Sequence, residues 1–347
     1  MQPDDLISLV VGGIKLTNFV RYSVTSDLFE AADAFEIEIA DISLDVKSGV
    51  RCELYVNGQK ELTGLIDKVS KHIEKTDASL TIEGRDLMGI VVDSYCTEYP
   101  DLASIKLEDL AARLLKNTPF IGRSSIRFGK GDKDRIAPLT RRDVEEDYKY
   151  TQIKPGTTIF DALKTTAMAW GMIFFNLPDG TFIFGQPITE GKPGFSLISR
   201  KDGRSNNIIS ATLTEDYSQR YSQVTVMGQS DGDYEGKGYN IKSTIKDASF
   251  PFYKPYVAIL EHDGQKPDAY ARIIMEDQKF KGYELEIKTP YHGQNGANYQ
   301  VNAMYHVEHD DLKINGDFVC YHRTFSRSKL EGSTTMVRLA KPGVTPA

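Results

Sequence analysis

Apolar and charged residues alternate at the beginning of the chain. Phe35, Ile37 and Ile39 are separated by glutamates, which is the period-two pattern of a strand with one face in solvent. Two apolar-rich runs flank Asn57-Gly58, a dipeptide that strongly favours a tight β-hairpin. Several short strands at close spacing predict that residues 1–93 form a first domain with the fold of a small barrel or sandwich.

The period then changes to that of helices. Residues 106–117 carry leucine and alanine at the three- and four-residue spacing of an amphipathic helix. A second helix is predicted to begin at Thr158, because Thr158 and Asp161 have the spacing of a capping box. A strand pair turned by Pro178-Asp179-Gly180 follows. Residues 94–205 are therefore expected to form an α+β middle domain.

Strand patterns return after residue 205. Strands are predicted at residues 219–228, 283–290 and 299–311. One helix is predicted between the first two of them, at residues 267–280. Residues 206–347 are expected to form a second β-barrel domain, with a small insertion around residues 232–282.

The two β regions resemble each other. EIEIAD, a strand pair around Asn57-Gly58 and SLTIEG occur in this order in the first region. ELEIKT, a strand pair around Asn315-Gly316 and TMVRLA occur in the same order in the second. The predicted fold class is mixed α+β and mainly β, with two barrel domains and an α+β domain between them.

The junction of the first and middle domains reads Gly84-Arg85-Asp86 and is followed by an apolar run. A dinucleotide-binding loop would need the pattern GxGxxG, which is not present. Asp86 instead suits the N-cap of a short helix, and Gly84 is expected to supply a left-handed backbone at the corner. We interpret this turn as architecture.

Composition limits the function classes. The net charge of −7 argues against a protein that grips nucleic acid over a broad basic surface. Cys52, Cys96 and Cys320 are far apart and odd in number, which favours three reduced, buried thiols. The acidic N-terminus lacks the positive flank of an export signal, and no apolar run approaches the ~20 residues of a membrane span.

Motifs for catalysis or metal binding fail on spacing. His306 and His309 stand three residues apart on a predicted strand and would point to opposite faces; adding His322 does not correct this. Residues 231–236 begin like a calcium loop, but Lys242 occupies the position of the bidentate glutamate. We therefore assign no catalytic residue, no cofactor-binding residue and no metal site.

The order of these segments resembles a known family. Residues 62–94, with their strand pair and Gly-Arg-Asp corner, residues 157–185, with helix and hairpin, and the closing residues 314–342 resemble baseplate hub (tail) proteins of Mu-like contractile-tailed phages and prophages. Late control protein D and the hubs of secretion spikes are related to this family. Each segment by itself has a strand pattern that many proteins share. The resemblance rests on the order of the segments along nearly the whole chain.

The resemblance implies a structural hub without catalytic motifs. It implies a homotrimer whose two tube-type barrels per subunit form a pseudo-sixfold ring, located in the virion at the tail baseplate and assembled in the cytoplasm of the host bacterium. Such a ring would join a hexameric tail tube to a trimeric spike protein, contact other baseplate proteins and let DNA pass without specific binding. Two alternatives remain open: a tail-associated cell-wall hydrolase and a module that binds host carbohydrate.

Overall fold

The computed structural model describes residues 5–75, 78–102, 105–121, 125–128, 152–169, 172–188, 190–228, 241–259 and 267–344. Seven strands form the N-terminal half of its main sheet: β1 (Ile7–Val11), β2 (Ile14–Leu16), β3 (Arg21–Asp27), β4 (Ala34–Ile39), β5 (Arg51–Val56), β6 (Gln59–Ile73) and β7 (Ala78–Asp86). Asn57 and Gly58 both have positive φ, at 51° and 76°, and join β5 to β6. This is the backbone that a two-residue hairpin loop requires, so the predicted hairpin is confirmed.

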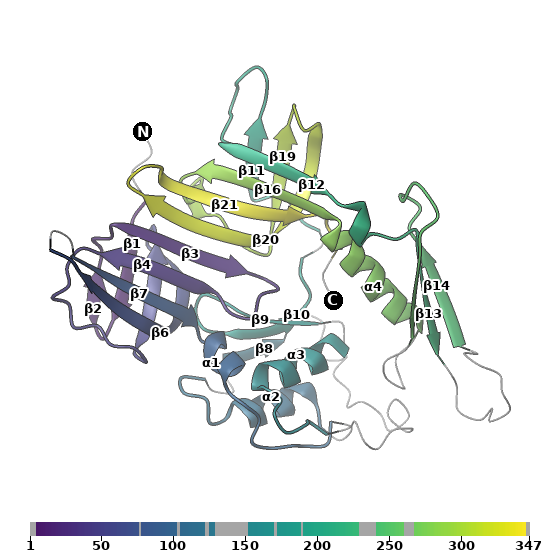
Figure 1. Ribbon diagram of the computed structural model, residues 1–347, viewed down its shortest axis with the longest axis horizontal. Helices are drawn as coiled ribbons and strands as arrows, with labels where there is room; N and C mark the ends of the chain where they lie inside the picture. Colours follow the sequence, from purple (N-terminus) through teal and green to yellow (C-terminus); the bar gives the residue numbers. More distant parts are fainter. Residues whose placement is uncertain are drawn as a thin grey trace.

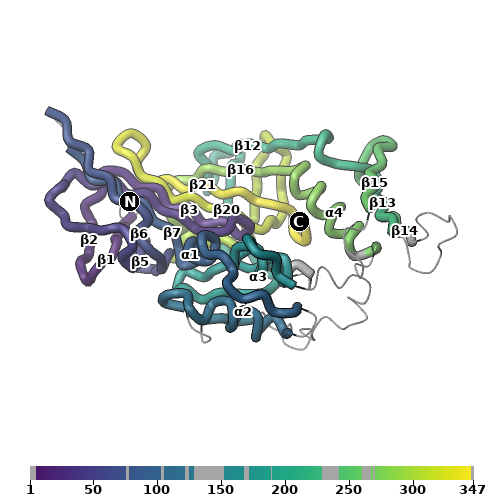
Figure 2. Tube along the Cα trace, turned by 60° about the horizontal axis from the view of Figure 1, so that its bottom comes forward, coloured from purple at the N-terminus to yellow at the C-terminus, as the bar shows by residue number. Residues whose placement is uncertain are grey.

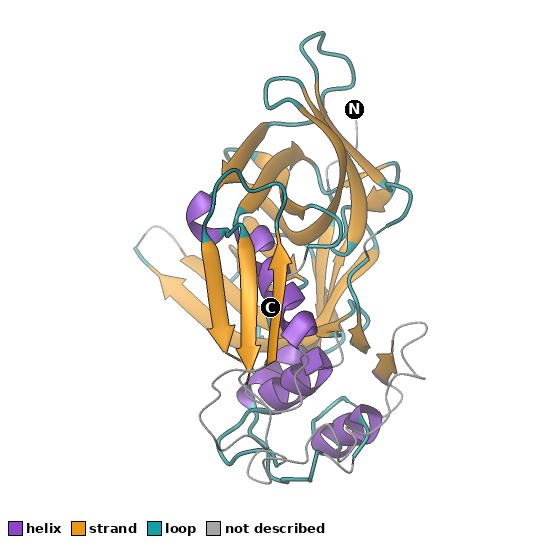
Figure 3. Ribbon diagram, turned by 90° about the vertical axis from the view of Figure 1, so that its right-hand side faces the viewer, coloured by secondary structure: helices purple, strands orange, loops and turns teal. Residues whose placement is uncertain are grey.

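A helical layer with a small sheet follows the first half. It contains α1 (Met88–Asp93), α2 (Leu107–Leu115), β8 (Ile126–Phe128), α3 (Ile159–Ala169), β9 (Ile173–Asn176) and β10 (Phe182–Gly185). Thr158 Oγ1 accepts a hydrogen bond from the Asp161 amide at 3.0 Å, which confirms the predicted start of α3. Figure 3 shows these helices gathered at one end of the molecule, below the strands.

Six strands form the C-terminal half of the main sheet: β11 (Phe195–Ser199), β12 (Ser210–Glu215), β16 (Tyr283–Pro290), β19 (Ala303–His309), β20 (Ile314–Ser328) and β21 (Gly332–Ala340). A 3₁₀ turn, η4 (Tyr217–Gln219), follows β12, and the short strands β17 (Gly293–Gln294) and β18 (Ala297–Asn298) pair after β16.

The segment inserted between β12 and β16 forms a unit of its own. β13 (Gln223–Gly228) lies between β14 (Ile241–Lys246) and β15 (Pro255–Ile259), and α4 (Pro267–Lys281) covers this small sheet. Val224 and Val226 are fully buried against Ala271 and Met275 of the helix. The strand predicted at residues 219–228 therefore exists, but it belongs to this unit and not to the main sheet.

The two halves join into one sheet of 13 strands (Figure 1). Its order is β12-β16-β21-β20-β3-β4-β7-β6-β5-β1-β2, with β19 beside β20 and β11 beside β19. Read from β3, the first half runs β3-β4-β7-β6-β5-β1; read from β12, the second runs β12-β16-β21-β20-β19-β11. The strand order thus repeats. The predicted separation into two barrels is not confirmed, because these pairings leave the sheet open.

One hydrophobic core serves both halves. It includes Leu9, Ile37 and Leu54 from the first half and Leu285 and Val307 from the second, all fully buried. A separate cluster lies in the helical layer, where α2 buries the predicted stripe of Leu107, Leu110, Ala111, Leu114 and Leu115. The boundaries at residues 93 and 205 stay predictions; β11, within the predicted middle domain, pairs in the main sheet.

Gly84 has a different role from the one expected. It lies inside β7, opposite Phe35 and Ile66, and is not among the residues with positive φ. A Cβ atom at this position would come within 2.4 Å of the Leu65 carbonyl oxygen and 2.6 Å of the Phe35 ring. Close approach of neighbouring strands, and not a left-handed backbone, requires the glycine.

The corner after Gly84 is built by its two charged residues. Asp86 Oδ1 accepts the Met88 amide at 2.9 Å, but Leu87 is the N-cap of α1, so the predicted cap is displaced by one residue. Arg85 donates to Asp67 on β6 and to Asp93 on α1, each at 2.6 Å. These bonds support the interpretation of the corner as architecture.

The predicted strand pair around Asn315-Gly316 has its turn elsewhere. Both residues lie in β20, paired with Glu308 and Val307. The chain reverses before them, at Lys313, whose φ of 54° is positive. Asn315-Gly316 does not form the turn, because both residues are paired with β19 within the β19–β20 ladder.

Candidate functional site

The two halves of the main sheet meet where β3 pairs antiparallel with the second part of β20. Residues 322–327 of β20 are hydrogen-bonded to β21 on one side and to β3 on the other. His322 Nδ1 lies 2.8 Å from Asp27 Oδ2, and the hydroxyls of Thr25 and Thr324 are 3.1 Å apart. We call this β3–β20 pairing the intrachain junction.

A buried ion pair holds the inner side of the junction. Arg323 and Glu61, from opposite halves, are 3% and 6% exposed, and Arg323 Nη1 donates to Glu61 Oε2 at 2.6 Å. Arg323 also donates to Ser26 Oγ and to the Tyr299 carbonyl, both at 2.8 Å. A buried ion pair is tolerated where hydrogen bonds offset its desolvation. Glu61 Oε1 also accepts a bond from the Asn298 side chain, whereas Arg323 Nε is buried without a hydrogen-bond partner among the described residues. The pair links the two halves of the sheet.

His292 extends this network toward the N-terminus. Its Nε2 lies 2.8 Å from the Tyr22 hydroxyl, its Nδ1 lies 3.2 Å from Thr335 Oγ1, and its amide donates to Asp5 Oδ2 at 3.1 Å. Burial lowers the pKa of His292 from 6.5 to about 4. The ring is therefore neutral at physiological pH and serves as a hydrogen-bonding bridge between the halves.

A cavity of about 350 Å³ lies beside the junction and reaches the helical layer. Its lining includes the carboxyl groups of Asp27, Asp33, Glu61 and Asp86, together with the Arg323 guanidinium. Burial raises the pKa of Asp33 from 3.8 to about 6, and burial also raises the pKa of Asp86 well above its usual value. An acidic cluster with raised pKa values is a feature that catalytic sites share with structural networks.

The bonds of these carboxyl groups favour a structural role. Asp33 Oδ1 accepts the Asp27 amide at 3.0 Å, and Asp86 accepts the first amide of α1. Asp27 Oδ1 accepts the amides of Phe29 and Glu30, at 2.8 and 3.0 Å. Each of these three carboxyl groups thus accepts hydrogen bonds from backbone amides of a turn, a strand end or a helix start.

The three histidines of the tested zinc motif have separate partners. His306 Nδ1 lies 2.8 Å from Asp317, His309 Nδ1 accepts the Leu312 amide at 3.3 Å, and His322 pairs with Asp27. Within the described part of the chain, no group of three or more His, Cys, Asp or Glu residues could hold a metal ion. That the protein binds no metal stays a prediction.

The cysteines agree with the sequence analysis: Cys52, Cys96 and Cys320 are free and buried. The calcium-like residues 231–236 lie outside the described residues, and Lys242 lies in β14. Over the described ranges, no helix is both long and apolar enough to cross a membrane.

Sequence reasoning missed the charged residues of the junction. Arg323 occupies the same face of β20 as the buried Phe325, and its guanidinium lies 3.9 Å from that ring. A charged residue on the apolar side of an alternating strand was the available signal. Its partner Glu61 could not be identified, because 262 residues separate the two in the sequence.

Comparisons with known proteins agree with this architecture. Residues 6–86 match the family model for the N-terminal part of the Mu phage baseplate assembly protein GpP-like family, and residues 220–272 match the third domain of the NMB1110-like tail proteins. Baseplate hub protein gp44 of Escherichia phage Mu is 23% identical over 288 residues, which cover 79% of this chain and 70% of that protein.

Two solved structures are similar over nearly the whole chain. The tail protein from Neisseria meningitidis MC58 superposes with a TM-score of 0.82 at 26% identity, covering 99% of this chain and 98% of its own. The 43 kDa tail protein of prophage MuSo2 from Shewanella oneidensis has a TM-score of 0.81 at 16% identity, with 97% and 98% covered. Together, the matches to family models, sequence and structure confirm the resemblance: the chain is a relative of the baseplate hub and tail proteins of Mu-like phages and prophages.

Proposed function

We propose that the protein is the structural baseplate hub of a contractile tail, a homotrimer that forms a pseudo-sixfold ring. The ring joins the hexameric tail tube to the trimeric spike, contacts other baseplate proteins and lets DNA pass during ejection. Residues 1–93 and 206–347 supply the two tube-type units of each subunit, and residues 94–205 form the domain between them. The assembled protein resides in the virion after assembly in the host cytoplasm.

The observation that carries this proposal is the repeated strand order in one continuous sheet. A trimer whose subunits each contribute two similar units presents six similar units around one axis. Such a ring can match sixfold symmetry on one side and threefold symmetry on the other. The tail and baseplate names of its relatives support the same role.

DNA passage requires a lumen that does not bind its cargo. Each lysine or arginine held against a phosphate would release counterions and make binding strong and salt-dependent. The net charge of −7 supports passage without specific binding.

Sedimentation equilibrium, together with electron microscopy of the purified protein, tests the proposal. We expect the mass of three chains and ring-shaped particles at micromolar concentration, with little retention of DNA in a filter-binding assay at low salt. A strict monomer at the highest soluble concentration, also after mixing with tube and spike proteins, would contradict the ring. Tight DNA binding with a steep salt dependence would contradict free passage.

The acidic cavity supports a second candidate, a cell-wall hydrolase. Asp33 and Asp86 have raised pKa values, as a general acid would need. Hydrolysis of peptidoglycan by the wild type, lost in both Asp33→Asn and Asp86→Asn proteins that keep their fold, would establish this function. We expect no hydrolysis, because the relatives are structural proteins and both carboxyl groups close local structure.

A further inference from the structure

The two halves of the main sheet can be aligned residue by residue through their long hairpins. β6 and β20 each have 15 residues, and β7 and β21 each have nine. In both hairpins the ladder shifts by one residue at one place, at Asp67 between Ile66 and Lys68, and at Tyr321 between Cys320 and His322. Counting from these bulges makes Lys68 equivalent to His322.

The outer strands align in the same way. β3 pairs with β4 as β12 pairs with β16, and each inner strand, β4 or β16, pairs in turn with β7 or β21. Following the two registers from the bulges makes Asp216, the residue after β12, equivalent to Asp27. Thr214 on β12 is equivalent to Thr25 on β3.

Only one of the two possible junctions is formed within the chain. β3 lies on the second part of β20, whereas the equivalent edges are open. β12 pairs with β16 alone, and residues 68–73 of β6 pair with β7 alone, as far as the described residues go. Figure 2 shows this part of the β6–β7 hairpin projecting beyond the body of the sheet.

Transferring the register of the intrachain junction onto the open edges places complementary residues opposite each other. His322 faces Asp27 in the junction, so Lys68 would face Asp216. Thr324 faces Thr25 with a hydroxyl contact, so Ser70 would face Thr214. The hydrogen-bonded His322–Asp27 pair is thus replaced by an opposite-charge pair, and the hydroxyl pair is reproduced by different residues.

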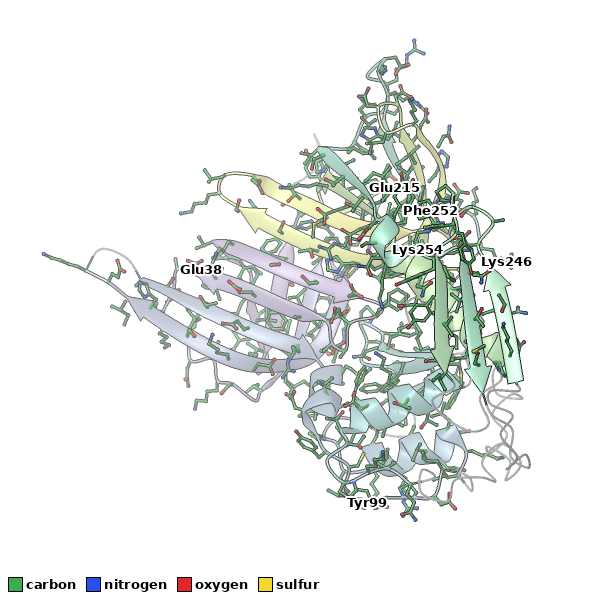
Figure 4. The ribbon with its side chains drawn as sticks, turned by 45° about the vertical axis from the view of Figure 1, so that its right-hand side comes forward. Glu38, Tyr99, Glu215, Lys246, Phe252 and Lys254 are labelled. Carbon is green, nitrogen blue, oxygen red and sulfur yellow. The ribbon has the colours of Figure 1, made fainter. Side chains whose placement is uncertain are left out.

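The open edges also have the exposure that a partner would cover. Ile73, at the end of β6, is 68% exposed and would come to lie opposite Ala211 of β12. The Lys68 side chain is 63% exposed and forms a surface pair with Glu83 at 2.7 Å, which costs little to rearrange. Glu215 ends β12 beside η4, where Lys254 donates to the Tyr217 carbonyl (Figure 4).

We propose that the open edge of β12 in one subunit pairs antiparallel with residues 67–73 of β6 in a second copy of this chain, in the register that sets Lys68 opposite Asp216. This inference rests on the proposed function and identifies the surfaces that join its subunits. Three copies then close a ring in which intrachain β3–β20 junctions alternate with interchain β12–β6 junctions. In this ring every β12 edge and every β6 edge is paired. No strand edge of these two types is then exposed, and exposed strand edges promote aggregation.

Disulfide trapping tests the register. Directly opposed residues of neighbouring antiparallel strands have Cβ atoms about 4.5–5.5 Å apart, close enough for a disulfide after small adjustment. The protein carrying both Lys68→Cys and Asp216→Cys should form covalent dimers and trimers on mild oxidation and no larger species. The native cysteines are buried, so they give little background.

A matched control shifts one cysteine along the same face. Lys68→Cys combined with Thr212→Cys places the second thiol four residues from position 216, about 13 Å away along the strand. We expect no trimer from this protein. A charge exchange adds a second readout: Lys68→Asp or Asp216→Lys alone should lower the trimer fraction, and the two together should restore it.

The outcomes separate the interface from the ring. A wild-type trimer without trapping at 68 and 216, or with equal trapping in the control, would overturn the proposed pairing and leave the hub function standing. Trapped ladders longer than three chains would support the pairing and overturn the closed trimer. A monomer without trapping under any condition would overturn both.

Discussion

The intrachain junction and the open edges at β12 and β6 occupy equivalent places in the strand order, but they differ in the residues at the positions of Arg323 and Phe325. At the junction, Arg323 is buried with Glu61, and Phe325, opposite Val24 of β3, is fully buried. The equivalent residues on β6 are Val69 and Lys71, and Lys71 reaches solvent and the Ile42 carbonyl. Breaking the first junction would leave a buried charge without its partner. Lysines on the open edge of β6 disfavour pairing of that edge with other strands.

This difference indicates how a duplicated unit can serve assembly. A pairing that exists in every subunit is built with buried groups that are hydrogen-bonded within the chain. A pairing that forms only with a second chain is built with exposed polar groups, which can hydrogen-bond to water in the single chain. The same strand order supports both, because the register is set by backbone and bulges while the side chains set the strength.

The largest effect is expected from breaking the buried pair. Arg323→Met leaves the Glu61 carboxylate buried without its charged partner, which should lower the free energy of unfolding by about 3–5 kcal/mol. The matched change Lys68→Met on the open edge should alter the stability of the single chain by less than about 0.5 kcal/mol. Urea denaturation of the two proteins checks this; similar losses would show that the two junctions are not chemically different.

The second effect distinguishes the two hairpins. Gly84→Val should destabilise the fold by about 3 kcal/mol, because its Cβ would meet the Leu65 carbonyl and the Phe35 ring. Gly316→Ala is the control, since a Cβ at Gly316 has only Phe318 within reach, at 4.0 Å. Thermal melting measures both. An unchanged transition for Gly84→Val would mean that the strands can separate there without cost.

The third effect concerns pH at the junction. The folded-state pKa of His292 is about 4, below the 6.5 of the unfolded chain, so the unfolded chain binds more protons between these values. Stability from the neutral ring is present above pH 6.5 and is lost as the pH falls toward 4. One pKa unit corresponds to 1.36 kcal/mol, so the loss from His292 between pH 7 and pH 5 should be about 2 kcal/mol.

Denaturation of the wild type and of His292→Gln at both pH values isolates this contribution. Asp33 acts in the opposite direction, because its raised pKa gives stability that is lost as the pH rises through about 6. It is present in both proteins and cancels in the difference. An equal pH dependence of wild type and variant would refute a buried neutral ring.

The smallest effect compares two equivalent threonines. Thr25→Val removes the hydroxyl contact with Thr324 inside the junction and should cost about 1 kcal/mol. Thr214→Val, at the equivalent position on the open edge, should leave the single chain unchanged at low protein concentration. Calorimetry of dilute protein measures both; a loss at Thr214 alone would reverse the comparison.

Local sequence determined most of the elements. Alternation defined β4 and β16, Asn57-Gly58 defined a hairpin, and the leucine stripe defined α2, because each of these signals depends on residues within a few positions of one another. The repeated order of segments also predicted the repeated order of strands. The resemblance to phage tail hubs followed from this order and is confirmed by the comparisons.

Tertiary structure alone decided how these elements meet. The pairing of β3 with β20 joins residues about 300 positions apart, and no local pattern specifies which strand edge stays open. The buried Arg323 and Glu61 depend on that pairing, and Gly84 depends on how closely β7 approaches the strands beside it. A short window of sequence records the preference of each residue for a face or a turn, whereas the partner across the sheet is chosen by packing of the whole chain.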